Sequence, residues 1–524
     1  MSYISADRVS GVGPLGAKVL FINNFPSGSA PMSEDAFRIL QKAYRGDITQ
    51  ARIMCLSEYA PANRDFSYLE GSAELRASLA LIDAYISQHP PEVIITLGEK
   101  PLNYITKEYN ITNWRGSPLE YKGIPLLPTL DPAIYGVFTM LQFDIEKALR
   151  IDQKRIYNDN FSITKDPVEQ RTYFDEILSA PYVTIDIESS RNEDITLLCV
   201  GFGLSAERAI CFAITSPSAL QNVAEILSQI KSPIYHNGLF DLTVLRHFHN
   251  MDAPPLVFDT LVAQHILEPE MPKDLGFLCS TLTWRPCYWG KIKFDDDKTW
   301  TERRSLEELY IYNCKDVCVT YEASESLRGE LVERKLLPIF EFELAAIEVS
   351  IHISHAGFFV DEERRGLLRD IITARWKLDY ITMCQLAEKN VLVSSPKQVK
   401  EFLYDNLKLP IRRDRDGKVT TGEDALVGLI AYAKSEQNKV RTPETKNKWA
   451  IKIAILKLIL NIRKYDKLLS SYINVKISKD GRLRGILKVA STESGRWAGG
   501  VYYDGTGLNI QTFPREVIEY EATS

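Results

Sequence analysis

Long apolar runs, sequence repeats and paired cysteines are all scarce in this chain of 524 residues. No segment approaches 18 uninterrupted apolar residues, and the N-terminus lacks a basic start followed by an apolar run. We therefore expect neither a membrane-spanning helix nor a secretory signal, and we predict a cytoplasmic protein with no membrane partner. The absence of a repeat of about 20 to 50 residues argues against a solenoid or a propeller. The length favours about three domains.

Cysteine is sparse, with eight residues and no CxxC pair, so the usual spacing of a structural zinc site is missing. Cys314 and Cys318 are four residues apart in an expected helix, and Cys279 and Cys287 precede them. One hypothesis is a metal site made of these thiols. The alternative is reduced, structural thiols, which are typical of cytoplasmic proteins.

The net charge of −6 speaks against a nucleic-acid partner, but the charge is unevenly distributed. Residues 396–500 contain 23 Lys and Arg against 11 Asp and Glu, so this stretch carries +12 and the rest of the chain carries −18. A basic stretch within an acidic protein is typical of contact with a phosphate backbone, although solvated faces also carry such charge.

Three regions differ in their pattern. In residues 1–160, short apolar runs alternate with helical stretches, which predicts an α/β domain with parallel strands; the runs are 17–23, 51–58, 91–98 and 124–130. In residues 165–330, three strand-like runs with short joints are followed by helix, strand and helix, the order of an RNase H-like fold. Residues 335–524 are mostly helical, with long helices expected over 340–357, which ends at Gly357, and 446–473.

Carboxylates mark the middle region. In the alternating run "YVTIDIESS", Asp186 and Glu188 fall on one face of a strand, where their like charges repel. Asp241 follows at a helix entry in "NGLFD", and "YNCKD" places Tyr312 and Asp316 one helical turn apart. Four carboxylates in three segments suit two Mg²⁺ or Mn²⁺ ions.

Each of these residues has a plausible role in such a site. Asp186 is expected to bridge both ions, and Glu188 and Asp316 to complete the position that activates water. Asp241 is expected to help hold the second ion, and Tyr312 to orient the attacking water. Taken singly, each residue also fits a solvated strand, a helix start or a packed core; their joint occurrence in this order favours the metal site.

The three motifs DxE, NxxxD with an aromatic residue before the Asp, and YxxxD resemble those of the DEDDy-type 3′–5′ exonucleases, the proofreading domains of DNA polymerases. The resemblance covers about residues 180–325. It implies two-metal hydrolysis of the terminal phosphodiester and contact of Asn237 and Phe240 with a single-stranded 3′ end.

The helical region resembles the thumb and the first palm segment of family A DNA polymerases, on residues 395–410, 420–426, 462–472, 481–500 and 507–516. The resemblance implies contact with primer-template DNA by seven residues: Lys464, Lys467, Lys488, Thr492, Arg496, Asn509 and Gln511.

The catalytic palm aspartates of family A DNA polymerases are expected after the last of these segments, and "VIEYEATS" at 517–524 does not match the family. We therefore expect no polymerisation by this chain alone. A split gene, an intron or intein, and truncation remain alternatives, and a second chain with palm and fingers is an expected partner.

The first region resembles the family 4-like uracil-DNA glycosylases, on residues 21–37, 60–66, 93–98 and 124–135, with "PANR" and "LPTLDP" as the closest pieces. The expected His-Pro is Asp131-Pro132 here, and Cys55 is the single cysteine of the region, so the four-cysteine iron–sulfur cluster of that family cannot form. The resemblance implies an inactive domain that holds DNA or a replication accessory protein, as in polymerases of large bacteriophages.

The leading hypothesis is the 3′–5′ proofreading exonuclease and DNA-binding portion of a family A DNA polymerase. One alternative is a non-catalytic DNA-binding scaffold subunit of a split replicative polymerase. A nuclease of the same group that acts on RNA is a third hypothesis.

Overall fold

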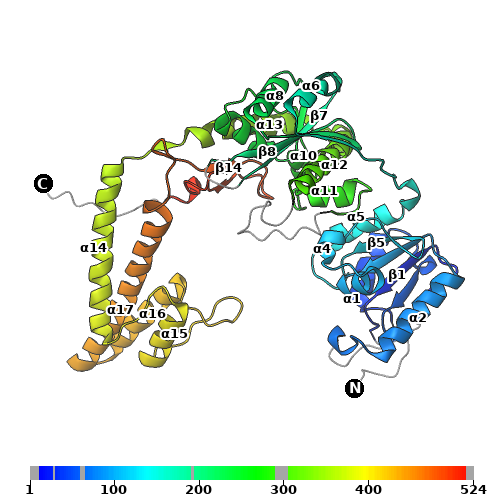
Figure 1. Cartoon of the computed structure of the whole chain (residues 1–524). Helices are drawn as coiled ribbons and strands as arrows, with labels where there is room; N and C mark the ends of the chain where they lie inside the picture. The colour runs from blue at the N-terminus through cyan, green and yellow to red at the C-terminus, as the bar shows by residue number, and fades with distance from the viewer. Residues whose placement is uncertain (1–10, 28–29, 59–64, 191–193, 289–304, 515–524) are drawn as a thin grey trace. The chain divides into compact units, whose positions relative to one another are not determined.

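The structure is a computed structural model that describes residues 11–27, 30–58, 65–190, 194–288 and 305–514. The chain divides into two compact units, Met1–Glu348 with Val489–Arg496, and Val349–Lys488 with Trp497–Ser524. The first unit contains two α/β sheets, and the second is mostly helical (Figure 1). None of the helices in the described ranges combines the length and apolarity needed to cross a membrane.

The first sheet has strands β1 (Val19–Asn23), β2 (Arg52–Cys55), β3 (Val93–Leu97), β4 (Leu119–Tyr121) and β5 (Ile124–Thr129). Their order is β2-β1-β3-β5-β4, and all neighbours are parallel except the hairpin β4–β5. Every residue of β1 and β3 is buried, which explains their mostly apolar sequences, VLFIN and VIITL. The predicted parallel α/β arrangement is confirmed. The "PANR" segment lies outside the described residues.

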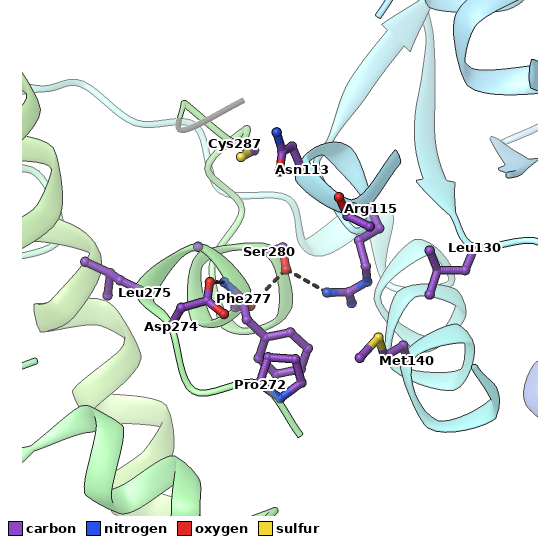
Figure 2. A pocket seen from close by; sticks show the side chains of 12 residues that line it. Asn113, Arg115, Leu130, Met140, Pro272, Asp274, Leu275, Phe277, Ser280 and Cys287 are labelled. Carbon is purple, nitrogen blue, oxygen red and sulfur yellow. Dashed lines mark hydrogen bonds between the residues drawn. The ribbon is translucent and has the colours of Figure 1, made fainter. Parts of the chain in front are cut away.

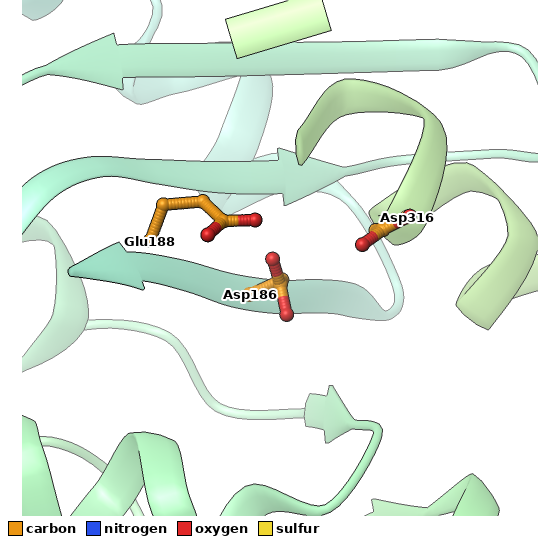
Figure 3. A group of neighbouring side chains, drawn as sticks. All are labelled: Asp186, Glu188 and Asp316. Atoms are coloured by element: carbon orange, nitrogen blue, oxygen red, sulfur yellow. The ribbon is translucent and has the colours of Figure 1, made fainter. Parts of the chain in front are cut away.

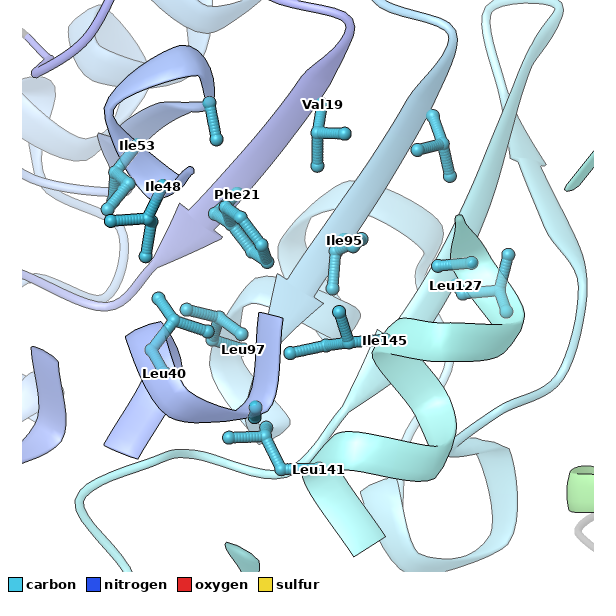
Figure 4. Close-up of a cluster of buried hydrophobic side chains, with 14 of the residues drawn as sticks. Val19, Phe21, Leu40, Ile48, Ile53, Ile95, Leu97, Leu127, Leu141 and Ile145 are labelled. Carbon is cyan, nitrogen blue, oxygen red and sulfur yellow. The ribbon is translucent and has the colours of Figure 1, made fainter. Parts of the chain in front are cut away.

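Helices cover both faces of this sheet: α1 (Glu34–Tyr44) and α5 (Phe138–Ala148) on one, α2 (Ala73–Gln88) and α3 (Glu99–Thr106) on the other. Successive strand residues point to opposite faces. Phe21 and Ile95 therefore pack with Leu141 and Ile145 of α5 (Figure 4), whereas Leu20 lies in the core on the opposite face. We call residues 11–148 the first domain.

The second sheet has strands β6 (Asn160–Thr164), β7 (Val183–Ser189), β8 (Leu197–Gly203), β9 (Arg208–Ala213), β10 (Pro233–Tyr235) and β11 (Phe258–Asp259). Their order is β11-β10-β7-β8-β9-β6. Strands β7, β8 and β9 form the predicted antiparallel set, and β10 is parallel to β7. Strand β6 pairs with β9 and lies between the two predicted domain ranges, so the second sheet begins before residue 165.

Around this sheet the chain forms α6 (Pro167–Thr172), α7 (Phe174–Ser179), α8 (Pro217–Leu227), α9 (Gly238–Thr243), α10 (Thr260–Leu267), α11 (Leu275–Leu282) and α12 (Leu306–Glu333). Helix α12 packs directly on β7, β8 and β9. Two glycines of β8 permit the close approach, because a Cβ on Gly201 would lie 2.2 Å from Asn313 Oδ1, and a Cβ on Gly203 would lie 2.8 Å from the carbonyl oxygen of Val317. Thr184 Oγ1 donates a hydrogen bond of 2.8 Å to that same carbonyl.

Four cysteines pack in the interface between α12 and the sheet, where they serve as small apolar side chains. Cys199 and Cys211 of the sheet pack against Cys314 and Cys318 of α12. All eight cysteines are free, and seven of them are buried. This agrees with the interpretation of reduced, structural thiols.

The second unit is built on α14 (Glu362–Ala387), α15 (Pro396–Glu401), α16 (Glu423–Lys439) and α17 (Pro443–Leu468). Helices α14 and α17 lie side by side, and α16 packs on α17 (Figure 1). Met383, Leu429, Ile455 and Ile459 are in their common core. Two short antiparallel pairs complete the unit: β12 (Phe358–Phe359) with β13 (Arg482–Leu483), and β14 (Ile486–Lys488) with β15 (Ala498–Gly500).

The long predicted helices are confirmed with small shifts at their ends. Helix α13 (Leu337–Ala356) ends before Gly357, whose φ of 56° lies in the left-handed region that favours glycine. The helix predicted over 446–473 begins at Pro443 and continues after Leu468 as a wider turn, Leu469–Ile473.

Candidate metal centre

Strand β7 presents Asp186 and Glu188 on one face, as the alternation predicts. In the antiparallel ladder, Asp186 lies opposite Gly201 and Glu188 lies opposite Cys199 of β8. Both cross-strand neighbours are small, so the two carboxylates have room on the face that α12 covers.

Helix α12 brings Asp316 to these two carboxylates (Figure 3). One ligand oxygen from each of Asp186, Glu188 and Asp316 lies within 4.8 Å of the others. Among the residues that the structure describes, these three carboxylates form the group of His, Cys, Asp or Glu side chains that lie close enough together to hold a metal ion. Tyr312 is one helical turn before Asp316, and a hydrogen bond from Tyr312 helps to stabilise the Asp316 carboxylate.

Asp241 approaches the same strand from α9 and is buried, with 3% of its surface exposed. Its Oδ1 accepts a hydrogen bond of 3.1 Å from the backbone N–H of Ile187, the residue between Asp186 and Glu188. The fourth predicted carboxylate is therefore next to the other three, although it is not a member of the 4.8 Å group.

The start of α9 is held by Asp259, a fully buried residue that sequence reasoning missed. Its carboxylate accepts hydrogen bonds from the backbone N–H groups of Asn237 at 3.3 Å and Gly238 at 2.8 Å. Asn237 has a left-handed φ of 61°, and a Cβ on Gly238 would lie 2.7 Å from Tyr235 Cβ. These contacts fix the helix that presents Phe240 and Asp241.

Two further side chains hold the carboxylates, and the sequence analysis did not find them. Asn313 Nδ2 donates to Asp186 Oδ2 at 2.7 Å and to the Asp186 backbone oxygen at 3.2 Å. The Tyr288 hydroxyl donates to Asp316 Oδ1 at 2.6 Å, and its ring meets that of Tyr312 edge to face, 5.7 Å between centroids. Asn313 directly follows Tyr312 in "YNCKD", so its position carried a signal; Tyr288 had no local signal.

Burial and mutual repulsion both disfavour the charged forms of these acids. Burial raises the pKa of Asp186 to about 7, and the hydrogen bond from Asn313 acts in the opposite direction. Burial and, after it, the charge of Asp186 raise the pKa values of Asp241 and Asp316 well above their usual range. A divalent cation would offset this repulsion, and carboxylate oxygens are the ligands that Mg²⁺ and Mn²⁺ prefer. The donor set thus fits the predicted metal.

The residues predicted to contact DNA lie in several places. Lys464 and Lys467 are exposed on α17, and Lys488 is exposed at the end of β14. Thr492 Oγ1 donates to the backbone oxygen of Arg496 at 2.8 Å and closes the turn that exposes the Arg496 side chain.

Asn509 and Gln511 belong to another turn of the second unit. Asn509 Oδ1 accepts from the backbone N–H of Gln511 at 3.0 Å, and Gln511 Nε2 donates to the carbonyl oxygen of Trp497 at 3.1 Å. A Cβ on Gly499 would lie 1.9 Å from Asn509 Oδ1, so the strand residue must be glycine. The contact of all these residues with DNA stays a prediction.

Comparison with known proteins identifies the middle region. Residues 161–332 match the 3′–5′ exonuclease domain of family A DNA polymerases. The chain contains a 3′–5′ exonuclease domain. The matched range runs from β6 to the last turn of α12, and it includes all four predicted carboxylates.

Two relatives extend this comparison. The DNA polymerase I of Synechocystis sp. is 25% identical over 207 residues, which make up 38% of this chain and 21% of that polymerase. The match thus spans about a fifth of the relative's length. The polymerase domain of Pol1 from M. smegmatis, solved in complex with DNA primer-template and dNTP, has a TM-score of 0.51 at 16% identity. That similarity covers 69% of this chain and 57% of the other, and it shows a related fold.

Proposed function

We propose that this chain is a divalent-metal-dependent exonuclease that shortens DNA from its 3′ end, as the proofreading portion of a family A DNA polymerase in DNA replication. The observation that carries this proposal is the convergence of Asp186, Glu188 and Asp316 within 4.8 Å inside the domain that matches the exonuclease family. The buried Asp241, hydrogen-bonded to the same strand, supports it.

In this proposal, Asp186, Glu188, Asp241 and Asp316 hold two Mg²⁺ or Mn²⁺ ions. When bound, such ions supply charge stabilisation at the scissile phosphate and make water more acidic. The Tyr312 hydroxyl orients the attacking water toward phosphorus, and the hydrogen bond from Asn313 keeps the Asp186 carboxylate in one orientation. Phe240 and Asn237 contact the last nucleotides of a single strand, because Asn237 caps α9 and Phe240 directly precedes Asp241 on it.

The second unit, together with the segment Val489–Arg496, binds the duplex in this proposal. Lys464 and Lys467 contact phosphates and position DNA without reading its sequence. Primer and template are contacted by Lys488, Thr492, Arg496, Asn509 and Gln511. The exposure of the cationic residues Lys464, Lys467, Lys488 and Arg496 and the net charge of +12 over residues 396–500 support this role. A fluorescence-anisotropy titration with primer-template DNA is expected to show affinity that falls steeply with salt. The double variant Lys464→Ala, Lys467→Ala should lower the slope of log affinity against log salt concentration by about two. The double variant Lys42→Ala, Lys107→Ala is the matched control.

We propose that the first domain has a glycosylase-like fold without base-excision activity. Asp131 stands where the resemblance expects a histidine, and Asn24 Nδ2 donates to Asp131 Oδ2 at 3.2 Å. The proposed partners of the whole chain are DNA, a second chain with palm and fingers, and a replication accessory protein. A bacteriophage origin, with action in the host cytoplasm, is part of the same proposal.

The decisive experiment is degradation of a 5′-labelled single-stranded oligonucleotide by the full chain with Mg²⁺. Stepwise shortening from the 3′ end is expected, and EDTA should stop it. Asp186→Ala should be inactive, whereas Asp252→Ala, an exposed aspartate of the same domain, should behave as the parent. Metal-dependent shortening by Asp186→Ala at the parent's rate would refute the proposal. A matched RNA oligonucleotide should be a poorer substrate; a preference for RNA would favour the RNA nuclease instead.

The exposed lysines of α17 also favour a non-catalytic DNA-binding scaffold. The same experiment separates the two functions. Salt-dependent DNA binding without any metal-dependent shortening by the parent chain would support the scaffold and exclude catalysis.

A further inference from the structure

The first domain is joined to the exonuclease domain through buried charges. Arg115 and Asp144 form an ion pair in which their side chains are 5% and 1% exposed. Arg115 Nη1 donates to Ser280 Oγ at 3.0 Å, across the domain boundary (Figure 2). Lys147 Nζ donates to the carbonyl oxygens of Gly116 and Ser280, both at 2.6 Å. Because buried charges are stable only when they are paired and hydrogen-bonded, these contacts fix the position of α11.

The chain after α11 is attached to the first domain as well. We call residues 283–288 the connector. The backbone N–H of Cys287 donates to the buried Ser117 Oγ at 3.0 Å. The Cys287 side chain is 7% exposed and packs against Leu102 and Trp114 of the first domain. Both the backbone and the side chain of this residue are thus held by the first domain.

The attachment is concentrated in few contacts. A pocket of about 430 Å³ lies at the interface, and its lining includes Arg115, Phe277, Ser280 and Cys287 (Figure 2). The hydrogen bonds of Arg115 and Ser117 and the packing of Cys287 hold the last residues of the connector on the first domain. Its earlier residues bond elsewhere: the Trp284 N–H donates to the Tyr157 hydroxyl at 2.8 Å, and Arg285 pairs with Asp159.

The next residue of the connector reaches the carboxylates. Tyr288 follows Cys287, and its hydroxyl donates to Asp316 Oδ1 at 2.6 Å. Its ring also packs edge to face on Tyr312. Outer hydrogen bonds of this kind orient ligating carboxylates and commonly change metal affinity or activity by about 10- to 100-fold when they are removed.

We infer that the first domain is a structural part of the exonuclease site: it anchors the connector at Cys287, and so places the Tyr288 hydroxyl on Asp316. Tyr288 is a positioning residue, because it acts through Asp316. The inference rests on the proposed function only in that Asp316 binds the metal. It assigns the first domain a role in nuclease action that needs neither base excision nor contact with DNA.

Metal binding by the full chain tests the inference directly. Titration with Mn²⁺, with the free ion followed by electron paramagnetic resonance, gives a Kd without any nuclease reaction. Tyr288→Phe keeps the ring and removes the hydroxyl, and it should raise this Kd by roughly 10- to 100-fold. Tyr68→Phe, in an exposed tyrosine of the first domain, should leave the Kd unchanged. An unchanged Kd in Tyr288→Phe would overturn the positioning role.

A double-mutant cycle tests the connection to the first domain. Ser117→Ala removes the acceptor for the Cys287 N–H and should raise the Mn²⁺ Kd roughly fivefold, the loss expected from one buried hydrogen bond. In the Tyr288→Phe background the same change should have no further effect, because its path to the metal is already broken. Ser87→Ala is the matched control. Independent, additive effects of Ser117→Ala and Tyr288→Phe would overturn the anchoring role.

Nuclease rates measured on the same proteins separate this inference from the proposed function. If the parent shortens DNA and Tyr288→Phe equals it in rate and in Mn²⁺ dependence, the inference fails and the proposed function stands. If the parent binds Mn²⁺ in a manner that depends on Tyr288 but shortens no DNA, the proposed function fails and the inference stands. Excess Mn²⁺ should restore the rate of Tyr288→Phe; a loss that Mn²⁺ does not restore would indicate a structural effect and contradict the inference.

Discussion

The two sheets of the first unit differ in the polar side chains near their strands: near the first sheet a carboxylate meets a neutral amide, whereas near the second sheet carboxylates meet one another. At the end of β1, Asn23 Nδ2 donates to the carbonyl oxygen of Pro31 at 2.9 Å, and the next residue, Asn24, donates to the carboxylate of Asp131. In the second sheet, three carboxylates meet within 4.8 Å. A lone carboxylate with neutral donors is stable without a cation, whereas three crowded carboxylates are stabilised by one.

The pKa values express the same difference. Burial raises the pKa of Asp131, but hydrogen bonds from Ala133 N–H and Asn24 lower it. Burial also raises the pKa of Asp316, and there the charge of Asp186 adds to the rise. The comparison indicates that mutual repulsion, rather than burial alone, distinguishes the candidate metal centre.

The largest expected effect comes from exchanging one carboxylate in each sheet. Asp241→Ala should lower the exonuclease rate about a thousandfold, because metal stabilisation of the transition state is worth several kcal/mol. Asp131→Ala should leave the rate within about twofold, since it removes a hydrogen-bonded carboxylate of the other sheet. Single-turnover rates on a single-stranded oligonucleotide measure both. Equal losses of exonuclease rate in the two variants would contradict the difference between the two carboxylates.

A smaller effect is expected from the neutral donor of Asp186. Asn313→Ala should raise the Mg²⁺ concentration needed for half-maximal rate by roughly 10- to 100-fold, because the bridging carboxylate loses its orienting hydrogen bond. Asn222→Ala is the control, since Asn222 is a buried amide of the same domain that bonds to Gln170. It should lower stability without moving the metal dependence. A shift of the same size in both variants would show that general destabilisation is responsible.

The smallest expected effect distinguishes the close packing of α12 on β8 from the intrinsic helix propensity of α12. Gly201→Ala would place a Cβ 2.2 Å from Asn313 Oδ1, so the Asn313 side chain or α12 must move. We expect a loss of about 1 to 3 kcal/mol in the free energy of unfolding and a lower exonuclease rate. Gly329→Ala, on an exposed face of α12 with nothing within 4 Å of the new Cβ, should instead stabilise by about 0.4 to 1 kcal/mol. Urea unfolding of both variants decides. Stabilisation by Gly201→Ala would contradict the close packing of α12 on β8.

Sequence patterns predicted the elements of the candidate site well. Alternation identified β7 and put Asp186 and Glu188 on one face, and the four-residue spacing put Tyr312 with Asp316 on α12. These patterns are local because backbone geometry sets the periods of strands and helices. Strand β6, Asn160–Thr164, was missed although its sequence NFSIT alternates polar and apolar residues, because a run of five residues with only two apolar side chains resembles the polar segment that follows it.

The positioning residues could not be predicted in the same way. Asp259 is 22 residues from Asn237, and Tyr288 is 28 residues from Asp316. Asparagine, tyrosine and aspartate are common in loops and helix starts, so residue type alone does not indicate a partner at such separations.

Local sequence patterns were enough to predict most strands and helices of the candidate site, to place Asp186 and Glu188 on one face of β7, and to show that these ligands suit a divalent cation. The convergence of Asp186, Glu188 and Asp316 depends on tertiary packing, because Gly201 and Gly203 let α12 approach the sheet. Tertiary packing also decided that Ser117 holds Cys287 across 170 residues. The physical reason is that periodicity follows from the backbone of one segment, whereas convergence depends on packing between segments that are distant in the chain.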